Sequence, residues 1–181
     1  MVQKLLLDMV ESVGGQEAVE DVKRRSGVSL DKHFNMNEVY EDDEWQRLFA
    51  STCDVLQLSR EQAIEAFADY FFKDAIKRWP AWFSMSCSAR EFLQRQPKIH
   101  NGFASAVEDQ SAGEAINDKF KLETNEAEII MHYRSPNRLC DLYKALASRI
   151  ITHYDDEATI EEFLCMHQGD EECEIHIRWA A

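Results

Sequence analysis

The pattern of apolar residues changes near residue 119, and this change restricts the possible folds more than any other feature. Before it, apolar side chains recur at helical spacing. After it, they fall in short alternating runs such as FKLETNEAEIIMHY, which is the period of half-buried strands. Helices that precede a small sheet, rather than alternating with its strands, are typical of α+β proteins with antiparallel sheets. We therefore predict one domain, mainly helical over about 1–118, with antiparallel sheet plus helix over about 119–181.

Five helices are expected before this change. Glycines should end the first two at Gly14 and Gly27, and Pro80 should end the fourth, because proline cannot continue a helix. The run Ser59-Arg-Glu-Gln has the spacing of a capping box at the start of the fourth helix. The predicted helices cover residues 4–13, 16–25, 45–56, 63–79 and 88–103, with a loop over 35–43.

The segment MHYRSPNRLC, residues 131–140, joins a predicted strand to an amphipathic helix expected over about 139–153. A Pro-Asn pair ends the strand. The junction between strand and helix therefore contains Tyr133, Ser135 and two arginines, Arg134 and Arg138. Hydroxyls and a guanidinium in this position could hold carboxylates. The alternative is a turn whose polar side chains only cap the next helix.

Composition limits the functional class. The net charge of −14 disfavours binding to nucleic acid or to an anionic membrane surface. No apolar run approaches the roughly 18 residues of a membrane span, and no signal peptide is evident, so a cytoplasmic location is expected. Five cysteines in such a chain indicate thiols or metal ligands rather than disulfides. Of these, Cys53 and Cys87 are expected to be core thiols.

Three cysteines fall after the change of pattern and form a candidate metal site. Cys165 and Cys173 flank a Gly-Asp turn that should bring two strands face to face, and Cys140 precedes them. Three thiolates and one imidazole make an ordinary tetrahedral zinc set, which on chemical grounds favours His167 over Glu162 as the fourth ligand. The competing interpretations are reduced buried thiols, or a redox switch in which oxidation releases zinc.

His100 follows Phe92 by eight residues in the fifth predicted helix, FLQRQPKIH, which contains Pro97. A single histidine of this kind is more often a packed or surface residue than a metal ligand. No general base lies at an informative spacing, so the sequence does not support a nucleophilic triad, and we expect no catalytic activity.

Together, F-x7-H and the later Y-x-S resemble the haem–nitric oxide/oxygen binding (H-NOX, HNOB) domain of soluble guanylate cyclases and of stand-alone bacterial proteins. The resemblance covers nearly the whole chain, including the KLLLDMVESVGG and AFADYFF helices and the C-terminal C-x7-C-x-I strand. It implies a helical lobe and a mixed lobe with haem b between them. By this resemblance His100 would be the proximal iron ligand, and Tyr133 and Ser135 would hold the propionates.

The chain departs from the family motif Y-x-S-x-R at Asn137, which stands at the arginine position and leaves Arg138 as a substitute. In oxygen-binding members a tyrosine nine residues after the motif tyrosine donates a hydrogen bond to O2. Leu142 stands there, so the pocket should bind NO and CO and discriminate against O2. The residues implied to face the open iron position, which are otherwise ordinary core residues, are Val2, Leu6, Phe71, Leu142 and Leu146.

Some bacterial members of the family also have a Cys/His zinc site, with a histidine where this chain has Glu162. The resemblance further implies an NO sensor that signals to a separate enzyme, a histidine kinase or a cyclic-di-GMP enzyme. NO binding opposite His100 would weaken the bond to His100 and free its helix. The alternative is a haem-free zinc/thiol redox sensor or interaction module on the same fold.

Overall fold

The computed structural model describes residues 1–36, 38–104 and 119–180. The chain folds into two compact units, Met1–Phe71 and Phe72–Ala181. The expected boundary between lobes, near residue 118, lies at the edge of the range outside the described residues, and it stays a prediction.

The first unit is helical. It contains α1 (Val2–Ser26), α2 (Asp42–Leu56) and the first part of α3 (Arg60–Arg78). The break expected at the glycine pair lies within α1, where Gly15 has φ 70° and ψ −174°. The left-handed Gly27 ends α1 and donates its N–H to Arg24 and Lys23 carbonyls, as expected for a helix closed by glycine. The largest fully buried side chains of this unit are Leu5, Leu6, Met9, Val10, Trp45, Leu48 and Phe67.

The predicted capping box at the start of α3 is confirmed. The Gln62 N–H donates to Ser59 Oγ at 3.1 Å, and the Ser59 N–H donates to Gln62 Oε1 at 2.9 Å. This reciprocal pair satisfies two backbone donors that have no partner inside the helix. A four-residue signal in the sequence thus sets where α3 begins.

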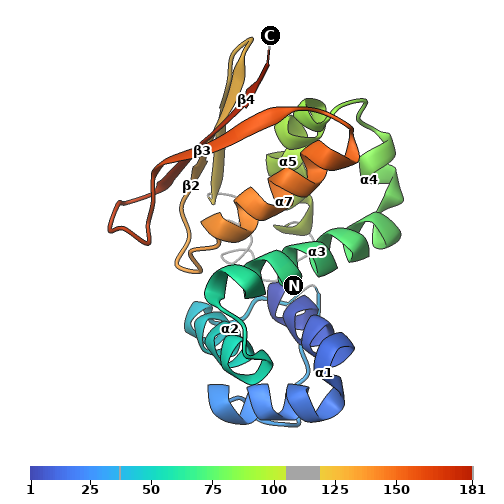
Figure 1. Ribbon diagram of the computed structural model, residues 1–181, viewed down its shortest axis with the longest axis vertical. Coiled ribbons are helices and arrows are strands. Elements are labelled where there is room, and N and C mark those ends of the chain that lie inside the picture. Colours follow the sequence, from blue (N-terminus) through green and yellow to red (C-terminus); the bar gives the residue numbers. More distant parts are fainter. Residues whose placement is uncertain (37, 105–118, 181) are drawn as a thin grey trace. The chain divides into compact units, whose positions relative to one another are not determined.

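The second unit combines helices with one antiparallel sheet (Figure 1). All strand pairs are antiparallel in the order β1-β2-β4-β3, so the predicted α+β fold is confirmed. The elements after α3 are α4 (Pro80–Ser84), α5 (Ala89–Ala104), β1 (Phe120–Thr124), β2 (Glu128–Tyr133), α7 (Cys140–His153), β3 (Ala158–Leu164) and β4 (Cys173–Trp179).

Alternation along the central strands selects the buried face of the sheet. Ile129, Met131 and Tyr133 of β2 are buried, and so are Ile175 and Ile177 of β4, while the residues between them are partly exposed. Helix α7 packs against β3, and α5 packs against both α7 and β1. The end of β2 pairs with the start of β4, and Cys173 at that start lies close to Cys140 at the start of α7.

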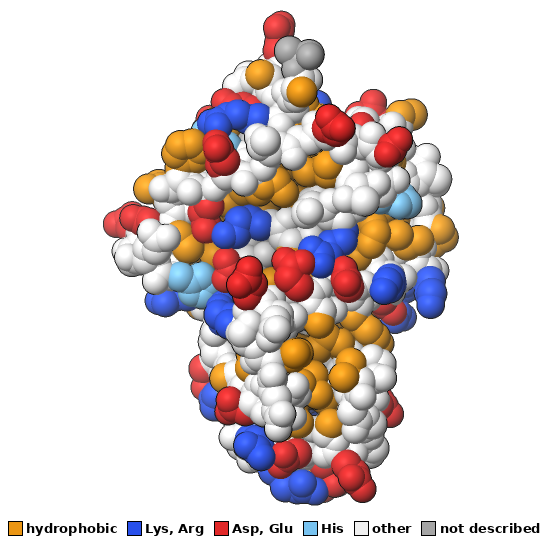
Figure 2. Space-filling model, in the orientation of Figure 1, with side chains coloured by type: hydrophobic (Ala, Val, Ile, Leu, Met, Phe, Trp, Pro, Cys, Tyr) orange, Lys and Arg blue, Asp and Glu red, His pale blue; other side chains and the backbone are white. Residues whose placement is uncertain are grey.

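The surface carries charges of both signs, with acidic and basic side chains interspersed on the face shown in Figure 2. Several of them pair one helical turn apart, as in Lys4–Asp8 and Arg78–Asp74, which supports the helices by a few tenths of a kcal/mol each, roughly. Of the helices within the described ranges, none has the length and apolar character needed to cross a membrane. The prediction of a core thiol is wrong for Cys87, which is exposed, whereas Cys53 is half-buried.

Candidate functional site

His100 lies in the second half of α5, and its half-buried imidazole packs against Phe120 of the sheet. The helix is anchored near its start by Phe92, whose ring stacks on Phe83 at 4.8 Å between centroids. Burial lowers the pKa of His100 from 6.5 to about 4, and the positive charge of Lys119 acts in the same direction. His100 is therefore a neutral imidazole at physiological pH. Its Nδ1 is buried and has no hydrogen-bond partner among the described residues.

The ring of Phe120 in β1 packs against this imidazole and against two tyrosine rings. Its ring centroid is 4.7 Å from that of His100, 5.0 Å from Tyr133 and 6.0 Å from Tyr143. The Tyr143 hydroxyl is buried and, within the part of the chain that the structure describes, has no partner. Burial raises the pKa of Tyr143 well above its usual range, so the phenol keeps its proton. Two buried polar groups without partners thus flank one aromatic ring.

Sequence reasoning did not single out Phe120 or Tyr143 for this site. Helix α7 places the ring of Tyr143 against that of Phe120. No sequence signal joins Phe120 to His100, because their contact depends on α5 packing against β1. For Tyr143, the only available signal was a polar aromatic residue on the apolar face of a predicted helix.

The turn between β2 and α7 orders the two predicted hydroxyls. The Leu139 N–H donates to the Tyr133 hydroxyl at 3.1 Å, and the Asn137 N–H donates to Ser135 Oγ at 3.3 Å. Ser135 is 1% exposed and also hydrogen-bonds to Tyr133. The helix-capping interpretation therefore describes real contacts. It does not exclude carboxylate binding, because the described contacts leave the phenol proton of Tyr133 available to donate.

The other residues predicted for haem lie in several places. Arg138 is exposed, has a left-handed φ of 48° and precedes α7 rather than belonging to it. Its carbonyl accepts a hydrogen bond from His167 Nε2 at 2.9 Å. Leu142 is 3% exposed and Leu146 is half-buried, both in the second unit. Val2, Leu6 and Phe71 belong to the first unit, so a shared distal pocket stays a prediction.

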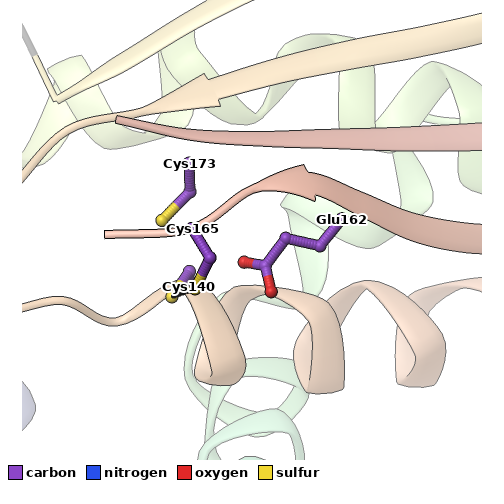
Figure 3. Close-up of side chains that lie close together, drawn as sticks. All are labelled: Cys140, Glu162, Cys165 and Cys173. Carbon is purple, nitrogen blue, oxygen red and sulfur yellow. Dashed lines mark hydrogen bonds between the residues drawn. The ribbon is translucent and has the colours of Figure 1, made fainter. Parts of the chain in front are cut away.

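Three buried thiols and one carboxylate form a compact cluster at the start of α7 (Figure 3). One ligand atom each from Cys140, Cys165, Cys173 and Glu162 lies within 4.8 Å of every other. Cys140 begins α7, Glu162 belongs to β3, and the other two cysteines lie at the facing ends of β3 and β4. His167 instead groups with Cys140 and Asp141, so its role as fourth ligand stays a prediction.

Local hydrogen bonds shape this cysteine cluster. The Cys165 N–H donates to Asp170 Oδ2 at 2.8 Å, and the Met166 N–H donates to Cys173 Sγ at 3.2 Å. Burial raises the pKa of Cys140 far above its usual range, and its hydrogen bond with Cys173 acts in the same direction. In the absence of a cation the Cys140 thiol therefore holds its proton, and a metal would have to displace that proton.

Glu162 offers a carboxylate oxygen as the fourth potential ligand of the cluster. Its Oε2 accepts a hydrogen bond from Lys144 at 2.7 Å, while its Oε1 is buried and has no partner within the described ranges. Figure 3 shows the carboxylate directed towards the three sulfurs. Three soft ligands and one oxygen arranged in this way suit a tetrahedral divalent ion such as zinc.

The arrangement of helices followed by a four-stranded antiparallel sheet with α7 is the H-NOX fold. A triple variant of an H-NOX protein from S. oneidensis in the Fe(II) state superposes with a TM-score of 0.80 at 17% identity, covering 99% of this chain and 95% of that chain. The S. oneidensis protein in the Fe(II)NO state gives 0.72 at 18% identity, covering 99% and 98%. An Fe(II) unliganded H-NOX protein from K. algicida gives 0.75 at 17% identity, covering 99% and 95%.

Family membership follows from the sequence itself. The model of the Haem-NO-binding (HNOB) family matches residues 1–162, so the chain belongs to this family. Cys165 and Cys173 lie beyond the matched range. No curated protein matches the chain significantly.

Proposed function

We propose that this protein is a haem-based nitric oxide sensor without catalytic activity, which signals to a separate enzyme by protein–protein contact. The observation that supports the proposal is His100: a neutral, half-buried imidazole whose buried Nδ1 has no partner among the described residues, in a chain of the Haem-NO-binding family. Only a neutral imidazole can present a lone pair to iron, and a pKa of about 4 preserves that form throughout the physiological range.

The residues of the second unit fit a haem. His100 would hold the iron, and the hydroxyls of Tyr133 and Ser135 would donate to the propionates. The unpartnered Tyr143 hydroxyl is a further donor in the same aromatic group. When bound, ferrous haem supplies an iron with an open position that takes NO.

His100 is placed to pass a change at its imidazole to the rest of the unit. It belongs to α5, which packs against α7 and β1. A ligand shifts a conformational equilibrium only by its differential affinity for the two states. Holding or releasing His100 supplies such a difference, because the imidazole is the only part of α5 proposed to bind the iron.

Selectivity for NO and CO over O2 would follow from Leu142. Bound O2 carries partial negative charge and requires a hydrogen-bond donor, which a leucine cannot provide. A histidine kinase or a cyclic-di-GMP enzyme is the proposed partner class. Acidic segments at the surface of the second unit (residues 155–157 and 170–172) would favour a basic docking face on such a partner.

The test is an absorption spectrum of the protein purified with haem available, before and after dithionite and then NO. The proposal expects a Soret band that shifts on reduction and again on addition of NO. The matched variant is His100→Gly, which should bind haem only when imidazole is supplied. A colourless protein, or a His100→Gly variant whose haem binding is unaffected by imidazole, would contradict the sensor function.

We further propose that the cysteine cluster binds zinc through Cys140, Cys165 and Cys173, with Glu162 or His167 as fourth ligand. The observation that favours this is the mutual approach of the four ligand atoms, Glu162 included, within 4.8 Å. A site of this kind could act as a redox sensor even without haem, since oxidation of the thiols would release the metal.

Metal analysis of the reduced and oxidised protein tests this second function. Stoichiometric zinc in the reduced protein and its loss on oxidation would support it. Comparing Glu162→Gln with His167→Gln identifies the fourth ligand, because only the variant that loses the ligand should bind zinc more weakly. A reduced wild-type protein that takes up no zinc would leave the cluster as ordinary buried thiols.

A further inference from the structure

Gln96 lies one helical turn before His100 on α5 and has an unexplained buried atom. Its Oε1 is buried and has no hydrogen-bond partner in the part of the chain that the structure describes. The same holds for His100 Nδ1. Buried polar atoms without a partner are rare in folded proteins, so two of them on adjacent turns of one helix call for an explanation.

The two atoms are chemically complementary. A neutral imidazole carries one N–H, and when one ring nitrogen binds a metal the proton is on the other. The oxygen of a glutamine amide accepts hydrogen bonds, and the terminal torsion of that side chain is soft enough to turn the oxygen towards a donor. Histidine ligands almost always donate their second N–H to an acceptor nearby.

Helix geometry brings these side chains together. Residues four apart lie on the same face with Cβ atoms about 5–6 Å apart, and helical side chains lean towards the N-terminus. The ring of His100 can therefore reach Gln96 and Pro97, which are four and three residues before it. In the described structure the side chains of His100 and Gln96 do not yet form a hydrogen bond. Pro97 offers no polar side-chain atom, so the Gln96 amide is the side-chain acceptor available on this face of α5.

We infer that Gln96 is a positioning residue for His100: its Oε1 accepts a hydrogen bond from Nδ1–H and directs Nε2 to the iron. This rests on the proposed function for the iron, but the tautomer can be observed without haem. The hydrogen bond places extra electron density on the imidazole and strengthens the iron–histidine bond. Gln96 would thus set how readily the binding of NO breaks that bond.

The frequency of the iron–histidine stretching band should increase with the strength of the hydrogen-bond acceptor at position 96. In the ferrous haem-loaded protein, Gln96→Leu should move the iron–histidine stretching band in resonance Raman spectra to lower frequency, and Gln96→Glu should move it to higher frequency. Gln96→Leu should also release haem about 10-fold faster, the lower end of the effect expected for losing such a partner. A purely structural role for Gln96 would not reverse the direction of the shift between Leu and Glu.

The matched control is Gln94→Leu. Gln94 is on the same helix, but its amide donates to Thr124 Oγ1 of β1 at 3.1 Å, so its loss should leave the stretching band unchanged. An equal band in wild type, Gln96→Leu and Gln96→Glu would overturn the inference.

A haem-free arm separates this inference from the proposed function. Nitrogen-15 NMR of the histidine-labelled haem-free protein should show His100 mainly as the Nδ1–H tautomer, and Gln96→Leu, but not Gln94→Leu, should shift it towards Nε2–H. If the protein binds no haem, the sensor function fails while the tautomer still decides the role of Gln96. An unchanged tautomer in Gln96→Leu would overturn that role whether or not haem binds.

Discussion

Replacing Tyr133 with phenylalanine distinguishes helix capping from haem binding at the turn between β2 and α7. Tyr133 is 2% exposed, and its hydroxyl accepts the Leu139 N–H at 3.1 Å. Tyr133→Phe deletes that acceptor and leaves a partly buried N–H without a partner, which should lower the free energy of unfolding by about 1–2 kcal/mol. For a chain of this length, such a loss lowers the melting temperature by about 3–6 °C.

The structure provides a matched control in Tyr143, which contacts the same phenylalanine ring. Its hydroxyl is buried and, among the described residues, has no partner, so Tyr143→Phe removes an unsatisfied group and should leave the haem-free protein unchanged or slightly stabilised. Urea unfolding of the haem-free wild type and of both variants measures the difference. Equal stabilities of Tyr133→Phe and Tyr143→Phe would refute the reasoning from the hydrogen bonds.

The same variants in the haem-loaded protein test the second role of Tyr133. If its phenol also donates to a propionate, Tyr133→Phe should lower the free energy of unfolding more with haem bound than without. Haem should also dissociate faster from the variant. A cost that is identical in both states would restrict Tyr133 to capping α7.

The remaining predictions concern a helix cap, a half-buried histidine and the cysteine cluster. Ser59→Ala should lower the free energy of unfolding by about 0.5–2 kcal/mol in urea titrations, because it removes the acceptor for the Gln62 N–H; no loss would mean that water replaces the cap. The pKa of His100 is lowered to about 4, so the unfolded chain binds the proton first and stability is lost as pH falls from 6.5 through 4. Over that window the free energy of unfolding of the haem-free wild type should fall by about 3 kcal/mol more than that of His100→Leu. Parallel pH profiles of stability for the two proteins would argue against a desolvated neutral imidazole. Zinc affinity should fall as pH decreases, since Cys140 must release a proton to bind; a flat profile between pH 6 and 8, roughly, would contradict thiolate ligation.

Local signals in the sequence were sufficient for most of the secondary structure. The Ser59 capping box, the glycine at residue 27 and the alternation along β2 each act within a few residues, so they can be read without knowing what packs where. His100, Tyr133 and Ser135 could be proposed for haem in the same way, because a family motif is also a local pattern, and their roles stay a prediction. The order of helices before strands then indicated the α+β class.

The tertiary structure decided the chemistry of the sites, because that chemistry depends on residues far apart in the chain. In the sheet, Glu162 of β3 pairs with the buried Ile175 of β4, and its side chain lies on the face that carries the cysteines. His167 lies beyond the end of β3, where the alternation of a strand does not determine the direction of a side chain. The neutral state of His100 depends on burial and on Lys119, and the ring beside it comes from β1. Distances and desolvation arise only when α5, β1 and α7 pack together, and no pattern along the chain encodes them directly.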